Sequence, residues 1–124
     1  RTEDAIYATK AALQEGIVPG GGVALLNASQ ELKADKAGKV LLNALSSPFN
    51  TILDNAGLEQ VAPRPIKGIG VDVVTSKEVN MVESGIIDPV LVTKSALKNA
   101  VSVALTIMSA DCVISNVRIP NASS

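Results

Sequence analysis

A run of three glycines after a proline is the feature that most restricts how this chain can fold. The run occupies residues 19–22 (PGGG), between a segment with helical spacing at Arg1–Glu15 and a second one that begins at Val23. Three successive glycines cost too much backbone entropy to lie inside either helix. We therefore expect a tight turn whose main chain is open to close approach. Taken alone, a plain helix–helix turn is favoured over a ligand-binding loop by roughly two to one.

Most of the remaining sequence also has helical spacing. The segment Lys39–Asn55 predicts a helix that Pro48 should bend or split, because proline removes a backbone donor and clashes with the preceding turn. The longest helix is expected to run from Asp88, as its N-cap, to about Ala110. The second half of this helix is apolar on nearly all sides, which predicts that it lies at the centre of a helical core.

Two segments have the composition of strands. Residues 68–79 contain β-branched runs bracketed by glycines and a polar turn, which predicts a small hairpin. Apolar and polar residues alternate over Cys112–Ile119, which predicts a C-terminal strand. The fold class is therefore mainly α, multihelical, with a small β-hairpin and a C-terminal strand.

Composition excludes several kinds of function. The 124 residues carry a net charge of −1, which argues against binding to nucleic acid or to an anionic membrane surface. The chain has no His and one Cys, Cys112, which excludes His-based catalysis, multi-thiolate zinc sites and an internal disulfide. Arg1–Gln14 lacks the apolar run of a signal peptide, and the apolar region Ala96–Ala110 is too short to span a bilayer. We therefore expect a cytoplasmic protein without membrane association.

Three aspartates are candidate functional residues, and each also has a purely structural explanation. Asp88 precedes a proline and could simply cap the long helix, which spacing alone favours by about three to one. Asp4 could complement a helix dipole or act as a base beside a water and a phosphate. Asp72 is most simply a turn residue of the hairpin.

Two long motifs in the same order carry a resemblance to a known family. The first covers residues 1–26 and includes RTEDAIYATKAA and EGIVPGGGVALL, and the second, NMVESGIIDPVLVTKSA, covers residues 80–96. Both strongly resemble the C-terminal equatorial segment of group I chaperonins, the GroEL type. The resemblance covers nearly the whole chain. It implies that residues 1–124 begin at the last helix of the intermediate domain, while the apical domain and the N-terminal equatorial helices lie outside this chain.

The resemblance also implies roles for individual residues in an ATP site. Asp4 matches the catalytic aspartate that orients the water attacking the γ-phosphate, and Asp88 matches the aspartate that binds the ribose hydroxyls. Gly21, with its neighbours Gly20 and Gly22, matches the turn whose main chain meets the nucleotide. Ile86 matches a residue of the adenine pocket. The family usually has Asn-Ala-Ala in a stem-loop against the adenine, where this chain has Asp72, Val73 and Val74, which add charge and bulk.

The implied protein is an ATP-dependent chaperonin, a homo-oligomeric ring that folds client proteins together with a co-chaperonin. Its phosphate-cradling loop and its Mg²⁺ ligand lie outside this segment, so we expect ATP and Mg²⁺ as cofactors, no metal ligand within these residues, and an inactive isolated segment. The family's terminal strand pairs with a neighbouring subunit, which makes Val113–Ile119 a candidate edge for association. The residues alone leave open two alternatives, a non-catalytic helical interaction module and a stand-alone binder of small ligands.

Overall fold

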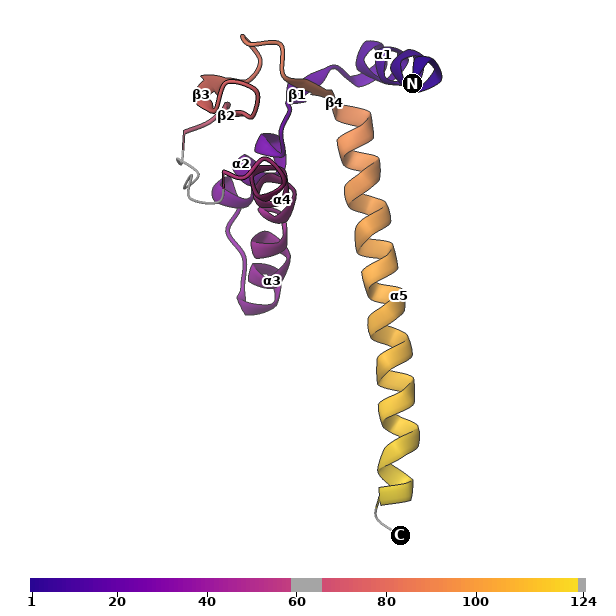
Figure 1. Cartoon of the computed structure of the whole chain (residues 1–124). Coiled ribbons are helices and arrows are strands. Elements are labelled where there is room, and N and C mark those ends of the chain that lie inside the picture. Colours follow the sequence, from indigo (N-terminus) through magenta and orange to yellow (C-terminus); the bar gives the residue numbers. More distant parts are fainter. Residues whose placement is uncertain (59–65, 123–124) are drawn as a thin grey trace.

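The structure is a computed structural model that describes the backbone of residues 1–58 and 66–122, with side chains as far as Ala110. Figure 1 shows three parts that diverge from a short two-stranded ribbon, β1 with β4. Helix α1 leaves the ribbon on one side, and the long helix α5 leaves it on another. The third part contains α2, α3, α4 and the hairpin β2–β3. The prediction of a mainly α fold with a small hairpin is confirmed.

The N-terminal helix ends where the sequence predicts. Helix α1 (Thr2–Glu15) has acidic residues in its first turn, where they complement the helix dipole. It stops at Gly16, which has a φ of 88° and whose amide donates to the Ala12 carbonyl at 2.8 Å. Strand β1 (Ile17–Pro19) follows at once.

The glycine turn leads into a group of short helices. Helix α2 (Val23–Glu31) starts after Gly22, which adopts a left-handed conformation with a φ of 78°. The predicted break at Pro48 is confirmed, because the structure has α3 (Lys36–Ala44) and then α4 (Ser47–Asn55), with the proline in the first turn of α4. Residues 59–65, between α4 and the hairpin, lie outside the described residues.

The predicted hairpin is formed by β2 (Ile69–Asp72) and β3 (Lys77–Asn80), which pair antiparallel with Ile69 opposite Asn80. A turn over residues 81–85 follows β3 and leads to β4 (Ile87–Pro89), the partner of β1. The hairpin and this turn pack on α2 and α4. The core cluster consists of Val23, Leu26, Phe49, Leu53, Val71 and Met81.

The C-terminal half of the chain differs from two expectations. Helix α5 runs without a break from Val90 to Ala122, so the strand predicted at Cys112–Ile119 is wrong, and with it the strand edge at Val113–Ile119. An isolated strand satisfies no backbone hydrogen bonds, and in the described part of the chain none of the strands pairs with these residues, so the helical ladder continues. The prediction that Asp88 caps the helix is also wrong. Asp88 and Pro89 belong to β4, and the Val90 amide donates to the Gly16 carbonyl at 3.1 Å.

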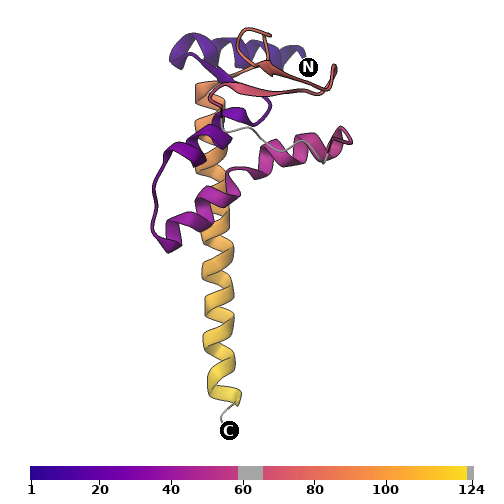
Figure 2. The same ribbon diagram turned by 90° about the vertical axis from the view of Figure 1, so that its left-hand side faces the viewer.

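The position predicted for the long helix is wrong as well. The described side chains of α5, up to Ala110, contribute nothing to the core cluster. The two views in Figure 1 and Figure 2 show that the helix extends well beyond the rest of the molecule. Val103, Ile107 and Met108 are each about 60% exposed (59%, 64% and 63%). The apolar surface that the sequence assigned to a core therefore faces solvent in this chain.

An apolar groove of about 410 Å³ separates α5 from the short helices. Its walls come from α2, α3, α4 and the N-terminal half of α5. The lining residues are Leu25, Leu41, Ala44, Leu45, Pro48, Ala96, Leu97, Ala100, Val101 and Ala104. The apolar part of α5 is also longer than the sequence indicated. The 21-residue segment Val90–Ala110, whose residues are exposed or half-buried, is long and apolar enough to cross a membrane by length and composition.

Candidate functional site

Pairing between β1 and β4 brings the two main sequence motifs together. Val18 lies opposite Asp88 and Pro19 lies opposite Ile87 in an antiparallel register. The ladder continues into the glycine turn, because the Gly20 amide donates to the Ile86 carbonyl at 2.8 Å. Two segments that are about seventy residues apart in sequence therefore lie side by side.

Each glycine of the turn faces a different part of the protein at short range. A Cβ atom on Gly20 would lie 3.1 Å from the carbonyl carbon and oxygen of Ile86. On Gly21 it would lie 2.8 Å from Cε of Met81, and on Gly22 it would lie 2.5 Å from the Phe49 nitrogen. Packing therefore requires a glycine most strictly at Gly22, where the neighbours are backbone atoms of α4, whereas the contacts at Gly20 and Gly21 are tight but could be relieved by smaller shifts.

The Asp88 carboxylate is available for a ligand. Asp88 is exposed, and its side chain takes part in none of the hydrogen bonds or ion pairs found among the residues whose side chains are described. It stands in β4, two residues from Ile86, which is half-buried and packs on the core cluster. An unpaired carboxylate can accept hydrogen bonds from vicinal hydroxyls, such as those of a ribose. In the neighbouring turn Gly20 is buried, whereas Gly21 and Gly22 are half-buried.

The predicted stem-loop residues lie at the tip of the hairpin. One carboxylate oxygen of Asp72 accepts from the Val74 amide at 2.9 Å, which closes the turn after β2 and confirms Asp72 as a turn residue. Val73 and Val74 are 41% and 89% exposed. These two apolar side chains are free to contact a ligand or a neighbouring protein surface.

Asp4 lies apart from the other candidate residues. It is exposed in the first turn of α1, whereas the ribbon follows the other end of the same helix. With 1.5 Å of rise per residue, about 18 Å of helix separates Asp4 from Gly16. The structure therefore joins the glycine turn to Asp88 and does not bring Asp4 to them.

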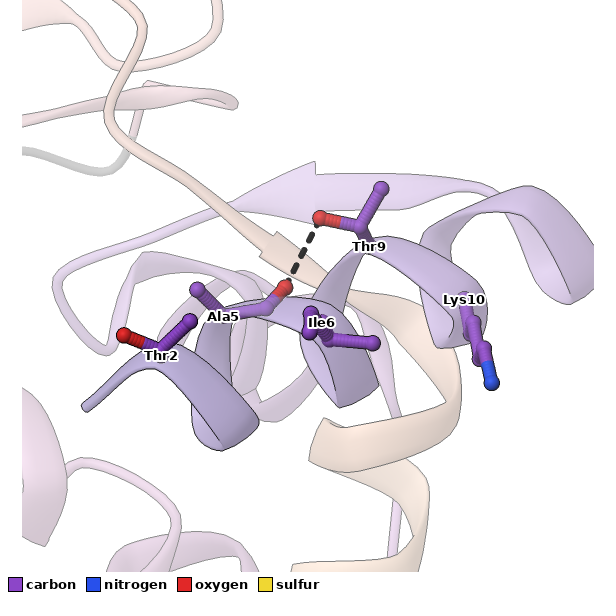
Figure 3. A pocket seen from close by; sticks show the side chains of 5 residues that line it. All are labelled: Thr2, Ala5, Ile6, Thr9 and Lys10. Carbon is purple, nitrogen blue, oxygen red and sulfur yellow. Dashed lines mark hydrogen bonds between the residues drawn. The ribbon is translucent and has the colours of Figure 1, made fainter.

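A shallow hollow of about 300 Å³ lies on the N-terminal half of α1 (Figure 3). Its lining residues are Thr2, Ala5, Ile6, Thr9 and Lys10, so Asp4 is not among them. The Thr9 hydroxyl donates to the Ala5 carbonyl of the same helix at 2.8 Å. This hydroxyl is already engaged within the helix, and the hollow is mostly apolar.

An ion pair connects α1 to α5 close to the ribbon. Nζ of Lys94 lies 3.0 Å from a carboxylate oxygen of Glu15, the last residue of α1. Together with the bond from the Val90 amide to the Gly16 carbonyl, it ties the end of α1 to the first turns of α5.

Two residues behind the glycine turn were not identified from the sequence. Phe49 and Met81 are 3% and 1% exposed and press against Gly22 and Gly21. Met81 lies inside the second family motif, but only the fold shows that it contacts the first motif. The described residues contain no group of three or more His, Cys, Asp or Glu side chains placed to hold a metal ion.

The arrangement of a long helix, a β1–β4 ribbon and a hairpin over short helices is that of a chaperonin. A solved structure, described as a group III chaperonin in the open state, superimposes with a TM-score of 0.66 at 29% sequence identity. The match covers 80% of this chain and 24% of that one, so the chain spans about a quarter of the solved chaperonin. The model of the TCP-1/cpn60 chaperonin family matches residues 1–118, and the chain belongs to this family. Group I membership stays a prediction.

Proposed function

We propose that this chain is the C-terminal part of the equatorial, ATP-binding domain of a chaperonin, beginning at the last helix of the intermediate domain. In this proposal it supplies the ribose and adenine side of the ATP site. The single observation that carries the proposal is the β1–β4 pairing, which puts the unpaired Asp88 carboxylate next to the glycine turn. Membership of the chaperonin family gives the reason to choose a nucleotide as the ligand.

Each group at the ribbon has a physical role in such a site. The Asp88 carboxylate accepts hydrogen bonds from the ribose hydroxyls, and the half-buried main chain of Gly21 and Gly22 allows a flat ligand to approach. The apolar side chains of Ile86, Val73 and Val74 exclude water from the base. Asp72, already used to close the hairpin turn, keeps these valines at the tip.

The catalytic role belongs to Asp4 in this proposal. Its carboxylate would orient the attacking water once the missing part of the protein, with its phosphate loop and Mg²⁺ ligand, completes the site. Asp4 lies at the end of α1 that is remote from the ribbon. The nucleotide would therefore have to contact α1 on a side different from the one that faces Asp88. We expect phosphate release by the full-length protein, a loss of this activity with Asp4→Ala, and negligible release by residues 1–124 alone.

The exposed apolar surface of α5 supports the idea that this chain is a piece of a larger helical domain. Its groove and its exposed residues, including Ile107 and Met108, would contact the remaining equatorial helices. Polar residues such as Lys94 and Lys98 interrupt this surface, which favours a protein partner over lipid. A cytoplasmic location is part of the same proposal. A homo-oligomeric ring, unfolded client proteins and a co-chaperonin complete the proposal.

Titration of the full-length protein with ATP and with 2′-deoxy-ATP tests the site. A hydrogen bond to a charged group contributes about 1.5–3 kcal/mol, so loss of one ribose hydroxyl should weaken binding by roughly 10- to 100-fold. Asp88→Ala should remove this preference for ATP. Asp54→Ala is the control, because Asp54 is also exposed but lies on α4, and this variant should keep the preference for ATP. Equal affinity of the unsubstituted protein for both nucleotides would refute the assignment of Asp88.

The same apolar surface of α5 favours a second candidate, a non-catalytic helical module whose function is association alone. In that case the full-length protein would bind neither nucleotide, and the glycine turn would serve only the packing on Phe49 and Met81. The ATP titration distinguishes the two, because only the nucleotide site predicts binding that depends on Asp88.

A further inference from the structure

Met81 lies directly behind the glycine turn and is only 1% exposed. We propose that Met81 is a positioning residue that fixes the conformation of the glycine turn relative to Asp88. This inference rests on the nucleotide site proposed above and adds a buried residue that touches no ligand itself.

The side chain of Met81 fills the space that two glycines leave. A Cβ atom on Gly21 would lie 2.8 Å from Cε of Met81, and one on Gly70 of β2 would lie 3.0 Å from its Cγ and Sδ atoms. The thioether is therefore held between the hairpin and the turn. An unbranched, polarisable side chain suits a gap of this irregular shape.

The main chain of Met81 connects to the other half of the site. Its carbonyl accepts from the Ile86 amide at 2.8 Å, and the Ile86 carbonyl accepts from the Gly20 amide at 2.8 Å. The Met81 amide in turn donates to the Gly68 carbonyl at 3.0 Å. Met81 thus contacts the turn through its side chain and holds the segment leading to Asp88 through its backbone.

Glycines make this support necessary. Gly21 and Gly22 have φ values of 65° and 78°, and because glycine can adopt many other backbone conformations, the neighbouring groups have to select this one. Removing the Met81 side chain would leave a cavity under the turn, into which the turn could shift. If only part of the population keeps the binding conformation, the apparent Kd rises by the inverse of that fraction.

The test compares Met81→Ala with Leu53→Ala in the full-length protein. Leu53 belongs to the same core cluster but comes from α4, and the two truncations have a similar expected cost. The first readout is hydrogen exchange by mass spectrometry on the peptide covering residues 17–23, whose Gly20 and Val23 amides donate to the Ile86 and Gly20 carbonyls. The second is the Kd for ATP, measured on folded protein.

We expect Met81→Ala to lose protection in this peptide and to weaken ATP binding about tenfold relative to Leu53→Ala. Met81→Leu, which conserves volume, should restore both readouts. The pair Met81→Val and Leu53→Val gives the same comparison with milder truncations that fold more readily.

Equal protection and equal ATP affinity in the matched Met81 and Leu53 variants would overturn the role of Met81. Lack of ATP binding by the unsubstituted protein would instead overturn the nucleotide site itself. The exchange measurement needs no nucleotide, so the two failures are distinguishable.

Discussion

Replacing Gly22 by alanine tests whether the glycine turn is fixed by its packing. Gly22 has a φ of 78°, and a Cβ atom there would lie 2.5 Å from the nitrogen and 2.7 Å from Cα of Phe49. Both are backbone atoms of α4, so the contact is relieved only by moving that helix away from α2. The left-handed conformation costs alanine about 1–2 kcal/mol, and overpacking costs about 1–3 kcal/mol. We expect Gly22→Ala to lower the free energy of unfolding by about 2–5 kcal/mol.

Gly57→Ala is the matched control. Gly57 has a similar φ of 72°, but a Cβ atom there would meet nothing within 4 Å. It should therefore lose only the conformational part, about 1–2 kcal/mol. Both substitutions reduce the entropy of the unfolded chain equally, so this contribution cancels in the comparison.

Urea denaturation followed by far-UV circular dichroism gives the free energy of unfolding of both variants. The difference between them isolates the cost of packing against Phe49. Losses that agree within about 0.5 kcal/mol would show that the turn has room for a side chain on its inner face, and the explanation of the glycines by packing would be refuted.

Two further predictions concern single polar contacts. Glu15→Gln removes the ion pair that joins α1 to α5, and because both side chains are partly exposed (36% and 55%), urea denaturation should show a loss of no more than about 1 kcal/mol. The double swap Glu15→Lys with Lys94→Glu should recover it, and no recovery would show that the pair does not interact. Asp72→Ala removes the acceptor for the Val74 amide and should cost about 0.5–1.5 kcal/mol, whereas Asp72→Asn retains an acceptor oxygen and should remain near the original value.

Local residue patterns determined most of the secondary structure. Gly16 ends α1, Pro48 separates α3 from α4, and the glycines and β-branched residues at 68–79 form the hairpin. These features depend on the backbone φ values that glycine can adopt and on the N–H group that proline lacks. Both are properties of single residues, so these features can be predicted without knowledge of the fold. The family motifs were also sufficient to predict that the glycine turn and Asp88 belong together, although no local pattern would bring them into contact.

Tertiary structure alone decided where these elements lie. The β1–β4 pairing turned Asp88 from an expected helix cap into a strand residue, because Val18 on a distant segment supplies the partner. Met81 and Phe49 became the support of the glycine turn for the same reason. Helix α5 is apolar enough for a core, but burial requires a surface to pack against, and in the described part of the chain α5 contributes nothing to the core cluster. Periodicity fixes which residues can share a face, whereas the partner of that face depends on contacts between distant parts of the chain.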